Sequence, residues 1–191
     1  CICTTTYFGE YGTCESGEYR EHLFLDEALS LSHADLGGLA VIWLIHDDAS
    51  PREFPALHKM DNGLFVYRVL EKERLGNTGN IPRTIAHAVK LAPWVLSLDS
   101  DGLLARDCIP RLQQIITKYP DKAVFGSFNT KYHRTLEDKG DHVMKQSLCE
   151  HGVLFRSEAW IGKRPDYGLL SNLTCEGPFP CLKPSGVQHT G

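Results

Sequence analysis

Residues 77–101 read NTGNIPRTIAHAVKLAPWVLSLDSD: a polar turn with glycine, a helical pattern, and a short apolar run that ends in two aspartates. Residues 83–92 suit a helix, and Pro82 suits its first turn, where the N–H that proline lacks has no partner in the helix. Residues 94–99 have the length of a buried strand. Asp99 and Asp101 repel each other and are costly to bury without a cation between them. The stretch therefore predicts a helix, a strand and a cation site at the end of that strand.

The same alternation of apolar runs and helical patterns extends over the rest of the chain. Strands are expected in CICTTTY (1–7), LAVIWLI (39–45), LFVYRVL (64–70) and AVFGSF (123–128), and helices over 20–31 and within 106–120. The polar segment 129–149 has no clear period and predicts a long irregular loop. Strands that alternate with helices predict an α/β domain whose central sheet is mixed and mostly parallel, flanked by helices. A length of 191 residues fits one domain.

Composition excludes several classes of function. The net charge of −4 offers no basic surface for nucleic acid. No apolar stretch approaches the ~18 residues of a transmembrane segment. The seven cysteines contain no CxxC pair and no zinc-type spacing, so they predict reduced thiols and a cytoplasmic location. The chain begins with Cys1, which predicts a processed start or a longer parent polypeptide.

Two acidic pairs follow expected parallel strands. Asp47 and Asp48 come after one strand, and Asp99 and Asp101 end another. The loop GNTGN (76–80) is expected at the same edge. Because ligands bind at the carboxyl ends of the strands in open α/β sheets, this convergence favours a binding site over isolated helix caps or solvated turns.

Two families contain stretches similar to these. LSLDSDGLLARD (96–107) alone resembles the first motif of haloacid dehalogenase-like phosphatases, in which Asp99 would be the nucleophile and Asp101 an acid/base. That motif normally lies on the first strand of the family, whereas several elements precede it here. The phosphatase is therefore the second-ranked hypothesis.

From end to end, the chain resembles family 2-type glycosyltransferases of the GT-A fold, which resembles the Rossmann fold. TTTY (4–7) is similar to their opening strand, IHDDAS (45–50) to their acidic turn, and residues 77–101 to their NxG loop, arginine-bearing helix and DxD strand. GVLFRSEAW (152–160) and PSGVQHTG (184–191) resemble their later strands. The resemblance implies one catalytic domain over 1–191, with a nucleotide-binding half at 1–101 and an acceptor-binding half at 102–191.

The resemblance also implies roles for particular residues. Asp101 and His189 would bind Mn²⁺ or Mg²⁺, and Asp99 would contact the ribose or the sugar. Asp47, Asp48, Thr5 and Arg83 would contact the nucleotide, which is UDP in most relatives. A hard divalent ion takes oxygen ligands and can join a carboxylate edge to a diphosphate, and an imidazole ligand favours Mn²⁺.

For the chemistry, the resemblance implies hexosyl transfer from a nucleotide-diphosphate sugar to a hydroxyl of an unknown glycan, protein or other acceptor. Inverting transfer needs a general base. Asp166 in RPDYGLLSNL suits that role, and Glu176 in TCEGPFP is the alternative. A non-catalytic GT-A domain that serves binding or assembly is the competing hypothesis from another functional class.

Overall fold

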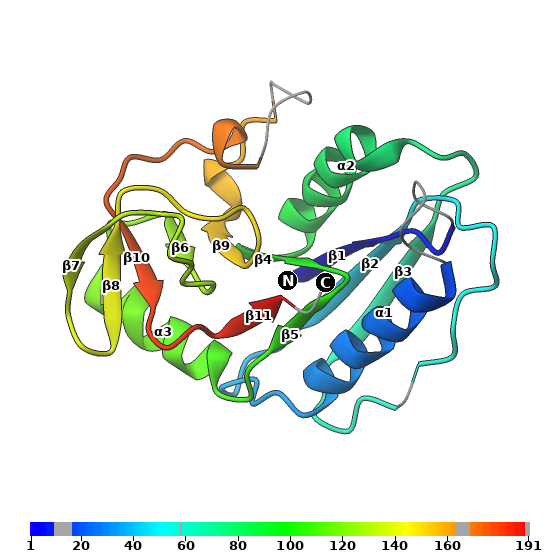
Figure 1. Ribbon diagram of the computed structural model, residues 1–191, viewed down its shortest axis with the longest axis horizontal. Helices are drawn as coiled ribbons and strands as arrows, with labels where there is room; N and C mark the ends of the chain where they lie inside the picture. Colours follow the sequence, from blue (N-terminus) through cyan, green and yellow to red (C-terminus); the bar gives the residue numbers. More distant parts are fainter. Residues whose placement is uncertain (10–16, 58, 163–168, 190–191) are drawn as a thin grey trace.

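One large mixed sheet organises the computed structural model, which describes residues 1–9, 17–57, 59–162 and 169–189 (Figure 1). In these residues nine strands follow the order β3-β2-β1-β4-β9-β6-β10-β8-β7. Their bounds are β1 Ile2–Thr6, β2 Ile42–Asp47, β3 Phe65–Leu70, β4 Trp94–Asp99, β6 Val124–Gly126, β7 Thr135–Asp138, β8 His142–Lys145, β9 Val153–Arg156 and β10 Phe179–Leu182. A two-stranded sheet pairs β5 (Gly102–Leu104) with β11 (Val187–His189).

The strand directions bring most strand ends to one edge. β3, β2, β1 and β4 are parallel neighbours. β9 runs antiparallel to both β4 and β6, and β10 is parallel to β6. β7 and β10 both run antiparallel to β8, so β7 is parallel to β10 as well. Seven of the nine strands therefore end at the same edge, which confirms the expected mixed, mostly parallel α/β fold.

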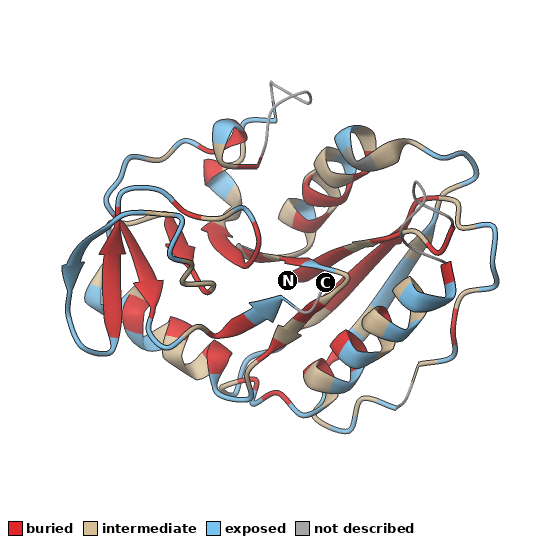
Figure 2. Ribbon diagram, in the orientation of Figure 1, coloured by how far each residue is buried: buried red, intermediate tan, exposed pale blue. Residues whose placement is uncertain are grey.

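Helices cover both faces of the sheet (Figure 1). α1 (Gly17–Ser32) and α3 (Cys108–Lys118) contribute to one apolar cluster, which includes Trp43 of β2. α2 (Gly76–Leu91) contributes to a second cluster with Leu44, and the 3₁₀ turns η1 (Ser157–Ala159) and η2 (Leu169–Asn172) lie on that side. Successive residues of β2 thus enter opposite clusters, as the period of two requires. The central strands are buried, whereas β3 and β7 are mostly exposed (Figure 2).

The predicted start of the helix at Pro82 was wrong. α2 begins at Gly76, so the expected GNTGN loop forms its first turns and Pro82 lies inside the helix. Pro82 cannot donate the usual bond to the carbonyl of Thr78. The early start has a tertiary cause, because the carboxylate of Asp48 accepts the N–H groups of Leu75 (2.7 Å) and Gly76 (2.8 Å).

The predicted irregular segment 129–149 was also wrong in part, because it contains β7 and β8. β8 is buried along its length and pairs with β10. Nζ of its Lys145 donates to the carbonyls of Thr130 (3.0 Å) and His133 (2.8 Å). These bonds allow the lysine to be buried, although a polar segment of this kind was expected to be an exposed loop. Among the described helices, none has both the length and the apolar character needed to cross a bilayer.

Candidate active site

Two carboxylates lie where the central strand β4 ends. Asp99 is the last residue of β4, and Asp101 follows in the turn that leads into β5. β5 pairs antiparallel with β11, and this register sets His189 opposite Gly102, next to Asp101. One turn and one strand pairing thus bring a histidine from the last described residues to the carboxylates.

A second strand pairing adds another histidine. β4 and β9 are antiparallel, with Ser97 opposite Val153, and the N–H of Gly152 donates to the carbonyl of Ser97 (3.0 Å). Continuing this register by two residues sets His151 opposite Asp99. His151 was not among the predicted site residues, because its partner strand is more than fifty residues away in the chain.

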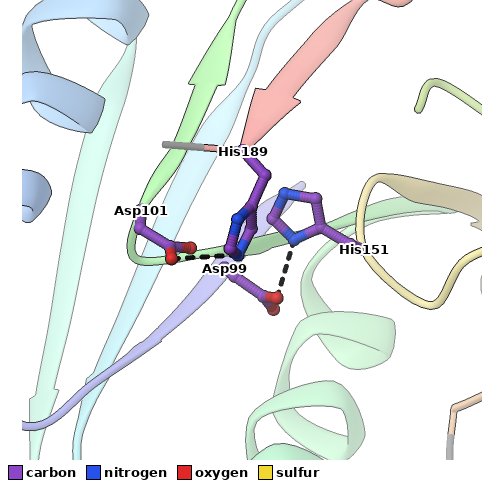
Figure 3. Close-up of side chains that lie close together, drawn as sticks. All are labelled: Asp99, Asp101, His151 and His189. Atoms are coloured by element: carbon purple, nitrogen blue, oxygen red, sulfur yellow. Dashed lines mark ion pairs between the residues drawn. The ribbon is translucent and has the colours of Figure 1, made fainter. Parts of the chain in front are cut away.

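The four side chains point toward one another (Figure 3). Nδ1 of His151 lies 2.7 Å from a carboxylate oxygen of Asp99, and Nε2 of His189 lies 2.9 Å from one of Asp101. The two imidazole rings meet edge to face, with centroids 4.8 Å apart. One potential ligand atom from each of the four residues lies within 4.8 Å of the others.

The pKa of the Asp101 carboxyl reflects its burial and the charges around it. Burial raises the pKa of the Asp101 carboxyl, and the nearby charge of Asp99 raises it further, while His189 and His151 oppose both effects. The side chain of His151 is only 5% exposed, and neither ring nitrogen makes a hydrogen bond with the described residues. Its contact with Asp99 is close, but it lies outside hydrogen-bonding geometry. Carboxylate oxygens beside a buried imidazole whose nitrogens make no hydrogen bond with the described residues fit a divalent metal ion.

A cavity of about 200 Å³ opens beside the cluster. Asp99, Asp101 and His189 line one part of it, and the expected nucleotide residues Thr5 and Asp48 line another. Tyr7 and Arg20 also line the cavity, although the sequence analysis did not select them. Arg20 lies on α1, where its position at the start of a helix gave no signal of a site.

The two aspartates after β2 differ in their surroundings. Asp47 accepts bonds from the hydroxyl of Thr6 (3.0 Å) and from the N–H (2.8 Å) and hydroxyl of Ser50. These bonds hold the turn in which Ala49 has a φ of +54°. Asp48, which holds the start of α2, lines the cavity, whereas Asp47 is not among its lining residues in the described part of the chain. The acidic turn is therefore a structural support at the edge of the site.

Arg83 points to a different partner from the one expected. Its Nη1 donates to Glu71 at 2.9 Å, and the same glutamate lies 3.7 Å from Nε2 of His46. Arg83 is not among the described residues that line the cavity. Asn80 lies about one turn before Arg83 on α2. It lines the cavity, and its side chain contacts Nδ1 of His46 (2.9 Å).

A second cavity of about 140 Å³ adjoins the first. Both are lined by Thr5, Ile81 and Asp99, so Asp99 stands between them. His151 and Glu150 line the second cavity, and a carboxylate oxygen of Glu150 accepts the N–H of Leu170 (3.3 Å). The arrangement offers one space for a charged ligand beside the carboxylates and another beyond them.

The two expected general bases do not both join this site. Asp166 lies outside the residues that the structure describes. Glu176 precedes β10, a strand parallel to β4, so it lies at the opposite edge of the sheet from Asp99. There its carbonyl accepts a bond from Nζ of Lys122 (3.2 Å). Glu150, by contrast, is next to His151 in the chain and lines the second cavity together with Asp99.

The sequence was compared with models of protein families and with curated proteins. The sequence matches the model of Glycosyl transferase family 2 over residues 30–179. No curated protein sequence matches it. The match does not support the phosphatase hypothesis, which rested on residues 96–107 alone.

Solved structures of TarS from S. aureus share the fold. TarS 1–349 aligns with a TM-score of 0.61 and 12% identity over 97% of this chain and 58% of that one. Its complex with UDP-GlcNAc aligns with a TM-score of 0.61 and 14% identity, over 100% of this chain and 58% of that one. The complex with UDP has a TM-score of 0.53 and 15% identity, over 83% and 46%. The chain thus spans about half the length of these proteins.

Proposed function

Since this chain belongs to glycosyl transferase family 2, we propose that it transfers a sugar from a nucleotide-diphosphate donor to an acceptor hydroxyl. The observation that carries the proposal is the meeting of Asp99, Asp101 and His189 beside a cavity that Thr5 and Asp48 also line. Residues 1–101 would form most of the donor site, and residues 102–191 most of the acceptor site.

For the donor, we propose a UDP-sugar. TarS structures that share this fold hold UDP-GlcNAc and UDP. In this chain the base would lie near Asp48 and Thr5, and the diphosphate would lie toward Asp99 and Asp101. The guanidinium of Arg20, which lines the same cavity, is placed to offset part of the diphosphate charge. A contact between Arg83 and the nucleotide would require Arg83 to leave Glu71.

For the metal, we propose Mn²⁺, with Mg²⁺ as the alternative, held by Asp101 and His189. A divalent ion supplies positive charge to the diphosphate as it leaves with the bonding electrons. Asp99 would orient the ribose or the sugar, and its position between the two cavities suits a group that faces both donor and acceptor.

The first experiment is a donor screen that monitors release of nucleoside diphosphate with and without Mn²⁺. We expect release from a UDP-sugar that needs the metal, and loss of metal-dependent UDP binding in Asp101→Asn. Asp107→Asn, at an exposed aspartate directly before α3, is the control. No binding of any nucleoside diphosphate with Mn²⁺ would instead favour the non-catalytic domain.

We further propose an inverting mechanism with Asp166 as the general base, from its place in the family pattern. Asp166→Asn should lower transfer by roughly 10²–10⁴-fold without weakening donor binding, because only proton acceptance is removed. Glu176→Gln and Glu150→Gln are measured in parallel. Normal transfer in Asp166→Asn, with loss in one of the other two, would move the role of base to that residue.

A further inference from the structure

We propose that His151 is a direct ligand of the metal, so that the site has two carboxylates and two imidazoles and selects transition ions over Mg²⁺. This rests on the proposed function, in which Asp101 and His189 hold the metal, and it adds the carboxylate of Asp99 to the ligands. It goes further, because His151 belongs to neither the DxD strand nor the closing strand on which that proposal was built.

The imidazole of His151 is buried, and its two nitrogens lack hydrogen bonds within the described part of the chain. The side chain of His151 is 5% exposed, and both ring nitrogens lack a hydrogen bond among the described residues. A buried polar group without a hydrogen bond is unfavourable, so one that persists in a native fold calls for a partner. The ring faces the carboxylate of Asp99 and the imidazole of His189 (Figure 3). A cation between these groups would supply the missing contact.

The surrounding backbone and side chains hold the imidazole ring of His151 in place. A Cβ on Gly102 would lie 3.2 Å from Cε1 of His151, so glycine leaves room for the ring against the β4–β5 turn. Gly152 has a φ of +68°, which an L side chain rarely adopts, and it turns the chain directly after His151. Phe128 packs edge to face on the ring at 5.4 Å. The imidazole is therefore positioned before any ion binds.

The four potential ligand atoms are close enough together for one ion. Ligand atoms of Asp99, Asp101, His151 and His189 lie within 4.8 Å of one another. Atoms on opposite sides of an ion with bonds of about 2.1 Å lie about 4.2 Å apart. The separations in the cluster do not exceed 4.8 Å, so small adjustments of the side chains would allow all four atoms to bind one ion.

The choice of metal follows from the donor atoms. Mg²⁺ prefers oxygen ligands and keeps several waters, whereas imidazole suits later transition ions such as Co²⁺ and Zn²⁺, and Mn²⁺ accepts it more readily than Mg²⁺ does. One imidazole gives a modest preference, and a second nitrogen at the same ion increases it. We therefore expect the site to bind Mn²⁺ and Co²⁺ much more tightly than Mg²⁺.

The test counts coordinated nitrogens directly. The protein is loaded with Mn²⁺, alone and with UDP, and electron spin-echo measurements on ¹⁴N- and ¹⁵N-histidine-labelled protein count the bound imidazoles. We expect two in the wild type and one in His151→Gln. The control is His142→Gln, a buried histidine of β8 that contacts Tyr119 (2.8 Å) and Asp141 (2.6 Å), and this variant should keep two.

Calorimetry supplies the second readout. Loss of groups that only orient a ligand typically costs 10–100-fold in metal affinity, so His151→Gln should weaken Mn²⁺ binding at least tenfold. Mg²⁺ binding should change much less, because the glutamine still offers an oxygen. The dissociation constant for Mg²⁺ divided by that for Mn²⁺, which measures the preference for Mn²⁺, should therefore fall.

The outcomes separate this inference from the proposed function. One imidazole in the wild type, unchanged Mn²⁺ affinity in His151→Gln, or no Mn²⁺ binding at all would overturn the inference. The wild-type count decides even where the variant does not fold. Two imidazoles without any sugar transfer would overturn the proposed function alone, and Mn²⁺-dependent transfer with one imidazole would overturn the inference alone.

Discussion

At the scale of the single residue, Glu27 shows how the site affects the core beneath it. Glu27 of α1 is fully buried, and one carboxylate oxygen accepts the hydroxyl of Thr4 (2.6 Å). The other has no hydrogen-bond partner among the described residues. Burial raises the pKa of Glu27 well above its usual value, and the charges of Asp99 and Asp101 add to the effect. The carboxyl therefore tends to stay protonated in the folded protein.

The first prediction is a pH dependence of stability that comes from Glu27. Its folded pKa lies above its unfolded value, so its contribution is fully present below the unfolded pKa near 4.5. That contribution is lost as the pH rises from there through the folded pKa. In urea unfolding from pH 4 to 9, Glu27→Gln should flatten the decline in the free energy of unfolding. The exposed Glu18→Gln should leave the decline as it is, and an equal slope in both variants would contradict the prediction.

A residue-scale test of the nucleotide side concerns Arg20. If its guanidinium meets the diphosphate, Arg20→Gln should raise the donor KM about tenfold, as expected for a lost charge-assisted contact of ~1.5 kcal/mol or slightly less. Arg83→Gln, whose arginine is paired with Glu71, should change the KM less. Steady-state kinetics with a UDP-sugar measure both values. The reverse order would return the nucleotide contact to Arg83.

At the scale of the element, the start of α2 depends on a side chain from another strand. The two oxygens of Asp48 accept different N–H groups, one from Leu75 and one from Gly76. A negative charge at this place also complements the helix dipole. Residues 76–81 contain two glycines and a polar run, which do not favour a helix by themselves.

The prediction at this scale is that Asp48→Asn shortens α2. An asparagine has only one acceptor oxygen, so one N–H loses its partner, at a cost of about 0.5–2 kcal/mol. Hydrogen exchange should show reduced protection at the amides of residues 80, 81 and 83, with the end of α2 unchanged, because the first-turn amides have no partner in the helix and Pro82 has no amide hydrogen. Asp35→Asn is the matched control, because Asp35 accepts a single N–H, from Gly37 (2.8 Å), which asparagine can also accept. Equal losses in both variants would contradict this account.

At the scale of the whole molecule, the metal cluster joins segments that lie far apart in the chain. Asp99 ends β4 and Asp101 follows it, His151 precedes β9, and His189 ends β11. An ion bound by all four would oppose the separation of these strands. Ligand binding to the folded state alone stabilises it by mass action.

The prediction at this scale is a metal-dependent rise in Tm. Mn²⁺ at 100 times its dissociation constant should stabilise the fold by about 2.7 kcal/mol relative to the same protein in EDTA. Asp101→Asn should remove most of the gain, whereas Asp107→Asn should retain it. A thermal melt that Mn²⁺ does not change would exclude a site built on this cluster.

Local signals in the sequence determined the fold class and the edge at which the site lies. The apolar run of residues 94–99 marked β4, and the alternation of strands and helices predicted the mixed α/β sheet. Asp99 and Asp101 were visible because they interrupt an apolar run abruptly. These patterns are local because period and strand length are properties of neighbouring residues.

Only the tertiary structure decided which distant side chains meet. His151 faces Asp99 because β9 inserts antiparallel beside β4, and α2 starts at Gly76 because Asp48 reaches it from the turn after β2. The same strand directions place Glu176 at the opposite edge from the cluster. Pairing register and strand direction depend on the packing of the whole sheet, and no local pattern in this chain encodes them.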